Sequence, residues 1–144
     1  MPEGLARRFH RGPAGPATVE AVHDELDSLW TETDFVPEAD RMAFTLAVVE
    51  TATNVVEHAV PATEAPLELA VDVTAAPHRL QAKIYEIGAA PVVRDLEASP
   101  TGEELEESGR GMALIQALVS TVVFERHGYT NVWELRREYH GDQP

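Results

Sequence analysis

The sequence predicts an α/β (α+β) two-layer sandwich, with helices on one face of a mostly antiparallel sheet. Three observations support this class. The chain has 144 residues, 44% hydrophobic and 25% charged, which suits one domain with its own core. Apolar residues recur at helical spacing in some segments and at alternate positions in others. The segments follow the order helix, helix, strand, strand, loop, helix, strand, strand, which is typical of hairpins covered by helices.

The N-terminal part is predicted to be an arm followed by a helix. Residues 1–17 are rich in glycine and proline and are expected to form a flexible arm or an edge strand near residues 5–9, while residues 18–140 form the single domain. The first helix is predicted from Thr18, which suits an N-cap, to about Thr31. Its apolar stripe consists of Val19, Val22, Leu26, Leu29 and Trp30.

A second, longer helix is predicted from Pro37 or Glu38 to about Ala59, because proline suits the first turn of a helix. Apolar residues occupy many positions along it. We expect its buried face to consist of Leu46, Val49, Thr53 and Val56.

Alternation of apolar residues predicts a hairpin at residues 67–74 and 79–86, joined by a turn at residues 75–78. The inner face of the hairpin is expected to carry Leu67, Leu69, Val71, Val73, Leu80, Ala82 and Ile84.

The C-terminal part is predicted to be a helix and a second hairpin. Residues 88–108 have no clear periodicity. Residues 111–120 are expected to form a helix with Met112, Ile115 and either Leu118 or Val119 facing inward. Residues 121–126 and 130–138 are expected to form the closing strands.

Polar residues lie at regular spacing on the second predicted helix. Glu50, Asn54, Glu57 and His58 share one side of it, since positions four, seven or eight apart are neighbours on a helix. A solvated helix face accounts for this spacing. A divalent-metal site also accounts for it, because all these side chains can be ligands. A metal hydrolase that uses Glu50 and His58 is less favoured, because the sequence offers too few further ligands.

Two other features suggest a ligand site. Glu86 ends its strand on the same face as Leu80, Ala82 and Ile84, so its carboxylate is expected to point toward the apolar layer, and Gly88 follows it. The motif GRGM, residues 109–112, directly precedes the third predicted helix, where backbone N–H groups can bind an anion. Each feature has an ordinary structural explanation, but together they could surround one nucleotide.

The charge and the hydropathy of the chain exclude several classes of function. Its formal net charge is -14, from 11 Lys+Arg and 25 Asp+Glu, so binding to the phosphates of nucleic acid is not expected. No apolar run is long enough for a membrane span, and the N-terminus lacks the apolar core of a signal peptide. We therefore expect a cytoplasmic protein that does not act at a membrane.

Four motifs resemble the GHKL ATPase family, in its branch of bacterial anti-sigma-factor serine kinases. LAVVETATNVVEHA resembles the N box, and IYEIGAAP resembles the adenine box. GRGMALIQALV resembles the second glycine box, and GYTNVWEL resembles the closing strand. The motifs occur in family order. The resemblance implies a sandwich of three helices on a mixed sheet.

The resemblance also implies roles for individual residues. Glu50 matches the general base, and Asn54 matches the residue that holds Mg²⁺ against ATP. Glu86 stands where an aspartate receives the adenine amino group, and Gly88 leaves room for the purine. Thr130 matches a threonine that supports this carboxylate, and His58 is expected to be structural. The phosphate-side loop corresponds to Gly109, Arg110, Gly111 and Met112.

The implied function is that of an ATP-dependent serine kinase that phosphorylates an anti-sigma-factor antagonist of the STAS type and sequesters a sigma factor. The resemblance also allows a homodimer. The alternative is a non-catalytic regulator of the same shape with a decayed nucleotide site. Glu86 in place of aspartate, together with the carboxylates of Glu103, Glu104, Glu106 and Glu107, favours this alternative.

Overall fold

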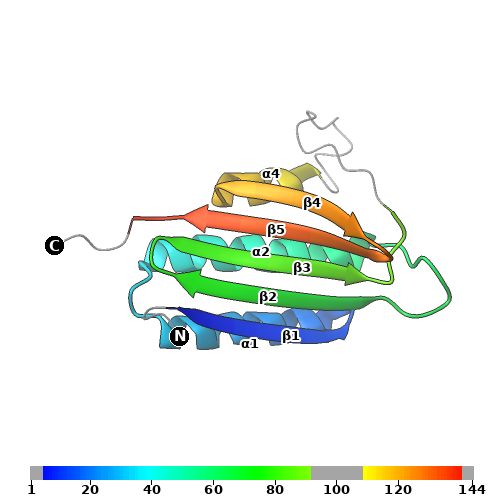
Figure 1. Cartoon of the computed structure of the whole chain (residues 1–144), viewed down its shortest axis with the longest axis horizontal. Helices are drawn as coiled ribbons and strands as arrows, with labels where there is room; N and C mark the ends of the chain where they lie inside the picture. Colours follow the sequence, from blue (N-terminus) through cyan, green and yellow to red (C-terminus); the bar gives the residue numbers. More distant parts are fainter. Residues whose placement is uncertain (1–4, 92–108, 141–144) are drawn as a thin grey trace.

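The computed structural model describes residues 5–91 and 109–140. These residues form one sheet covered by helices on one face (Figure 1). The elements in chain order are β1 (Ala6–Pro13), α1 (Pro16–Glu32), α2 (Glu38–His58), β2 (Glu68–Ala76), β3 (Arg79–Ile87), α4 (Gly109–Leu118), β4 (Thr121–His127) and β5 (Thr130–Glu138). No described helix is both long enough and apolar enough to cross a membrane.

The sheet has five strands in the order β1-β2-β3-β5-β4. All four pairings between these strands are antiparallel. The resemblance implied a mixed sheet, but the described strands contain no parallel pair. The predicted class, a two-layer α/β sandwich with a mostly antiparallel sheet, is confirmed. β5 lies between β3 and β4 because the chain passes through α4 to the sheet edge before it returns. This order places Glu86 of β3 opposite Asn131 of β5, which in turn lies opposite Arg126 of β4.

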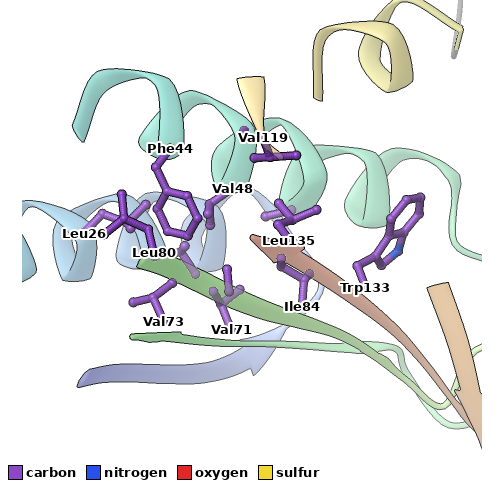
Figure 2. Packing of buried hydrophobic residues seen from close by; sticks show 14 of the residues in the cluster. Leu26, Phe44, Val48, Val71, Val73, Leu80, Ile84, Val119, Trp133 and Leu135 are labelled. Atoms are coloured by element: carbon purple, nitrogen blue, oxygen red, sulfur yellow. The ribbon is translucent and has the colours of Figure 1, made fainter. Parts of the chain in front are cut away.

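The core lies between the helices and the inner face of the sheet (Figure 2). Alternate residues of β3, from Leu80 to Glu86, are fully buried, as the alternation predicts. Trp133 of β5 is the largest fully buried side chain, and its ring meets Phe124 edge-to-face at 4.9 Å between centroids. On α4, Ile115 is buried, Val119 directly after the helix is 9% exposed, and Met112 packs against the cluster. The predicted inner face of this helix is therefore confirmed.

The structure corrects the predicted inner face of the second helix. The buried residues of α2 are Phe44, Ala47, Val48, Thr51, Ala52, Asn54 and Val55. Leu46, predicted to be inside, is 45% exposed, and Val49, Thr53 and Val56 are only partly buried. The apolar residues occupy almost every side of α2, so their periodicity does not select a single face. Packing against the sheet and α4 selects it.

The first helix begins earlier than predicted. α1 starts at Pro16, with Gly15 as the N-cap residue and no side-chain hydrogen bond at the cap. Thr18 is therefore not the N-cap. It lies inside the first turn, where it is 5% exposed and where its Oγ1 would be 2.7 Å from a Cβ added at Gly12. Proline at the first position of α1 explains the earlier start, because its fixed φ suits a helix and its missing N–H is not needed there.

Candidate functional site

The polar residues of α2 separate into a buried residue and exposed residues. Asn54 is 8% exposed and faces the interior. The side chains of Glu57 and His58 are 59% and 34% exposed, and His58 Nε2 lies 3.6 Å from Glu57 Oε2. Glu50 is partly buried, one helical turn before Asn54. The polar residues of α2 therefore do not form a wholly solvated helix face, because Asn54, in the middle of them, is buried.

Asn54 lies against the first turn of α4. A Cβ added at Gly111 would be 3.1 Å from Asn54 Nδ2 and 3.2 Å from Asn54 Oδ1, so glycine allows this close approach. Within residues 5–91 and 109–140, the side chains of Asn54 and Glu50 make no hydrogen bond or ion pair. A buried amide without a partner is unfavourable unless a ligand binds it. The structure thus brings the Asn54 amide to the backbone of the predicted phosphate-side motif.

The glycines of that motif lie inside the helix. α4 begins at Gly109, so Gly109, Arg110 and Gly111 form its first turn instead of preceding it as the sequence suggested. The first turn of a helix has N–H groups without intrahelical partners, which suit an anion. Met112 packs against the core and so helps to hold the first turn of α4 in position. The Arg110 side chain and the acidic residues 103–107 lie outside the described part of the chain.

Glu86 is fully buried, and both of its carboxylate oxygens accept hydrogen bonds. Trp133 Nε1 donates to Glu86 Oε2 at 2.5 Å, and Asn131 Nδ2 donates to Glu86 Oε1 at 3.3 Å. The predicted inward direction of Glu86 is confirmed. The same carboxylate also links β3 to β5 through these two hydrogen bonds. The resemblance to the family implied only an adenine-binding role for Glu86.

A row of polar side chains, buried at Glu86 and Asn131 and partly buried at Arg126, continues toward the sheet edge. Asn131 Nδ2 also donates to the carbonyl oxygen of Ala90 at 3.0 Å, and Asn131 Oδ1 accepts from Arg126 Nη1 at 2.8 Å. Arg126 Nη1 donates in addition to the carbonyl oxygen of Ala89 at 3.0 Å. Asn131, Trp133 and Arg126 are not among the residues predicted for the site. Alternation placed Asn131 and Trp133 on the face of Leu135, but only the strand register places them beside Glu86.

Gly88 and Thr130 lie where β3 meets β5. Gly88 has a φ of +80°, a backbone conformation that residues with a side chain rarely adopt. A Cβ added at this position would have space, because its nearest neighbour would be the carbonyl oxygen of Pro66 at 4.0 Å. Backbone conformation therefore selects glycine here more than lack of space. The Gly88 N–H donates to Tyr129 O at 2.9 Å, and its carbonyl accepts from Ala62 N at 2.9 Å. Thr130 pairs with Ile87, one residue before Gly88, so the two predicted residues lie close together.

Comparison with known families identifies the domain. Residues 12–136 match the model of the histidine kinase-like ATPase domain. The chain belongs to this family. The resemblance to the GHKL ATPase fold inferred from the motifs is thereby confirmed. A search of curated protein sequences finds no match.

Solved structures of two other proteins share the fold. The crystal structure of the RsbU and RsbW domains of Rv1364c from Mycobacterium tuberculosis matches with a TM-score of 0.65 and 16% identity, over 96% of this chain and 33% of that chain. The histidine kinase domain of the blue-light activated histidine kinase EL346 from Erythrobacter litoralis matches with a TM-score of 0.52 and 16% identity, over 88% of this chain and 61% of that chain. The chain thus spans a third of the first protein's length, and at these identities the likeness shows the fold alone.

Proposed function

We propose that the chain binds Mg²⁺-ATP and transfers the γ-phosphoryl group to a serine of a partner protein. The partner is an anti-sigma-factor antagonist of the STAS type, and in a second state the chain sequesters a sigma factor in the cytoplasm. Membership of a histidine kinase-like ATPase family supports ATP as the nucleotide. The observation that supports the proposal best is the buried side chain of Asn54 beside Gly111, which has no hydrogen-bond partner in the described part of the chain.

The donor set around Asn54 suits Mg²⁺. The amide oxygen is a hard ligand, and Mg²⁺ usually takes one or two protein oxygens together with phosphates and waters. When bound, Mg²⁺ supplies charge neutralisation on the phosphates. The N–H groups in the first turn of α4 supply further positive potential next to Asn54.

Glu50 is the proposed base. Its carboxylate is partly buried and has no partner among the described residues, so it is free to accept a proton. It takes the proton from the serine hydroxyl while the serine oxygen forms a bond to the γ-phosphorus. The bond between that phosphorus and the bridging oxygen breaks, and ADP leaves with the electron pair. Catalysis of this kind depends mainly on positioning and charge.

Glu86 is the proposed acceptor for the adenine amino group. Each carboxylate oxygen has two lone-pair directions, and Trp133 and Asn131 each use one. A further acceptor direction is therefore available on each oxygen. Gly88 and Thr130 lie at the end of the same strands and form the surroundings proposed for the purine.

A second candidate function is a binding regulator without nucleotide chemistry. The observation in its favour is that Glu86 is completely buried and already hydrogen bonded to two neighbours. In such a protein the carboxylate acts only as a link between β3 and β5, and partner binding is independent of ATP.

Calorimetric titration with Mg²⁺-ATP and transfer of labelled phosphate to the serine antagonist test the proposed function. The parent protein is expected to bind ATP and to transfer phosphate. Glu50→Gln should keep ATP binding but slow transfer by about 10²- to 10⁴-fold, the usual contribution of a general base. Glu57→Gln, on the solvent side of the same helix, is the matched control and should behave like the parent. A parent that neither binds ATP nor transfers phosphate contradicts the kinase proposal and supports the binding regulator.

A further inference from the structure

An exposed groove runs between α1 and α2 on the side of the helices away from the sheet. Two cavities of about 430 and 440 Å³ lie along it, and His23 and Val49 line both of them. We call this surface the α1–α2 groove and define it by Val19, His23, Trp30, Met42, Leu46 and Val49. The residues proposed to act on ATP do not line these two cavities, so the groove is a separate surface.

The floor of the groove is a stripe of α2 whose first two apolar residues are exposed, while Val49 and Val56 also pack against the core. Met42 is 67% exposed and Leu46 is 45% exposed, and partly buried residues continue the stripe at Val49, Thr53 and Val56. The intervals between these positions are alternately four and three residues. This heptad-like spacing is typical of a seam that packs against another helix. α2 therefore has one apolar face against the sheet and, at Met42 and Leu46, apolar side chains that are exposed on another side of the helix.

The rim of the groove carries negative charge. Glu20, Asp24 and Asp27 are exposed along α1 and line the two cavities. Arg41 is the only Arg or Lys among the lining residues, and its guanidinium donates to the carbonyl oxygens of Val36 at 2.7 Å and Thr33 at 2.9 Å. Two of the N–H donors of Arg41 are thus already used in hydrogen bonds within the chain. A helix with an apolar face and basic flanks complements this groove.

We propose that the α1–α2 groove binds an amphipathic helix of a partner protein whose apolar face is flanked by Lys or Arg. Apolar side chains of that helix cover Met42, Leu46 and Val49, and its basic side chains face the rim on α1. A second copy of this chain is a poorer occupant, because it would place the acidic rims of two molecules against each other. This inference rests on the proposed function only in assuming a protein partner.

The α1–α2 groove lies close to Glu50, the proposed catalytic base. Glu50 lies four residues after Leu46 and three residues before Thr53 in α2, so it is a neighbour of the stripe on the helix surface, and a helix bound to the stripe lies beside Glu50. The groove would then hold a partner close to the site of phosphoryl transfer. It would do so through contacts that need no nucleotide.

Fluorescence anisotropy of a synthetic helix tests the groove without ATP. The probe is an amphipathic peptide of about three heptads, with Leu at the seam positions and Lys on both flanks. One comparison peptide has the same seam with Glu flanks, and another has the basic composition in scrambled order. The full chain is expected to bind the basic amphipathic probe at least about tenfold more tightly than either comparison peptide.

Matched variants locate the binding surface. Leu46→Gln and Asp24→Lys should each weaken binding of the basic probe by about tenfold. The controls are Val123→Gln, which changes a 42% exposed apolar residue on β4, and Glu64→Lys, which makes the same type of charge change in an exposed loop. Both controls should leave the affinity unchanged. All these variants alter exposed positions, so loss of folding is not expected.

Four outcomes overturn the proposal. Equal affinity for the scrambled peptide, or equal loss in the control variants, indicates general attraction to an acidic protein. A dimeric parent that becomes monomeric with Leu46→Gln assigns the groove to a second copy. Absence of binding by the basic probe rejects a basic helix as the occupant. Because the assay contains no nucleotide, these outcomes leave the kinase proposal to its own test.

Discussion

Asn54 is the residue whose environment most needs a functional explanation. Asn54 is 8% exposed, and its amide lies beside Gly111 and has no hydrogen bond within the described residues. A buried polar group without a partner typically lowers stability by about 1–3 kcal/mol. The unfavourable burial is understandable if Mg²⁺ or a phosphate completes the site.

Replacement of Asn54 should separate binding from stability. Asn54→Ala removes no hydrogen bond to residues 5–91 or 109–140 and introduces a better helix former, so the free energy of unfolding should change by less than about 1 kcal/mol. Mg²⁺-ATP affinity should nevertheless fall by tenfold or more, because the proposed metal ligand is lost. Urea unfolding and calorimetry measure the two effects. A loss of stability without a loss of affinity would assign Asn54 a structural role.

The length of Glu86 has a structural reason in this chain. Its carboxylate reaches Trp133 Nε1 at 2.5 Å, in a fully buried position. Glu86→Asp withdraws the carboxylate by one methylene group, so the hydrogen bond from the indole N–H to this carboxylate is lost. We expect the free energy of unfolding to decrease by about 1–3 kcal/mol.

A double-mutant cycle isolates this contact. In a Trp133→Phe background, Glu86→Asp should cost clearly less than in the parent, because the indole donor is already absent. Denaturant unfolding of the four proteins gives the coupling energy. Equal costs in both backgrounds would show that the Glu86–Trp133 hydrogen bond does not determine the preference for glutamate.

At the scale of elements, β1 is attached to the sheet edge by ion pairs as well as by its strand pairing. Arg7 Nη2 contacts Asp72 Oδ2 at 2.6 Å, and Arg11 Nε contacts Glu68 Oε2 at 2.8 Å, both across to β2. The hydrogen bond from Arg11 holds the pKa of Glu68 below its usual value, and the charge of Arg11 adds to this effect. These contacts are exposed, so each contributes modestly.

The Glu68 pair makes the attachment of β1 dependent on pH. A carboxyl with a lowered folded-state pKa contributes stability that is complete above its unfolded pKa, about 4.3, and is lost as pH falls through the lower folded value. Hydrogen exchange of β1 amides should therefore accelerate, relative to a model peptide, below about pH 4. Arg11→Gln should remove most of this dependence, whereas Arg79→Gln on β3 should not. An identical pH profile in the Arg11 variant would contradict this role.

For the whole molecule, the formal net charge of -14 opposes compact folding through self-repulsion. Raising NaCl from about 0.01 M to about 0.5 M shortens the Debye length from about 30 Å to a few Å. The unfolding temperature should therefore rise with NaCl. A variant with Glu20, Asp24 and Glu64 replaced by neutral amides should show a smaller rise. A falling unfolding temperature would indicate that the ion pairs of β1 outweigh the repulsion.

Several parts of the fold were predictable because local rules determine them. Period-two alternation identified both hairpins and the inward direction of Glu86, since a side chain in a strand can point to only two faces. The order of helices and hairpins predicted the two-layer class. The spacing of Glu50 and Asn54 and the GRGM motif indicated the family that residues 12–136 match.

Other parts depended on contacts between distant segments. The inner face of α2 was mispredicted because its apolar residues surround the helix, and only packing against β3 and α4 decides which of them are buried. The network of Glu86, Asn131 and Arg126 requires the registers of β3, β5 and β4, which no local pattern specifies.

By itself, the sequence determined the three helices, the two hairpins, the layer class and the family, because these follow from periodicity and from motifs within single segments. The full length of β1 (Ala6–Pro13), expected as an arm or an edge strand near residues 5–9, depended on its pairing with β2. The tertiary structure alone decided that Asn54 meets Gly111, that Glu86 binds Trp133, and that Leu46 faces solvent. Each of these facts joins residues or faces of different elements. Their positions are set by the packing of the whole core, in which every element competes for the same buried space.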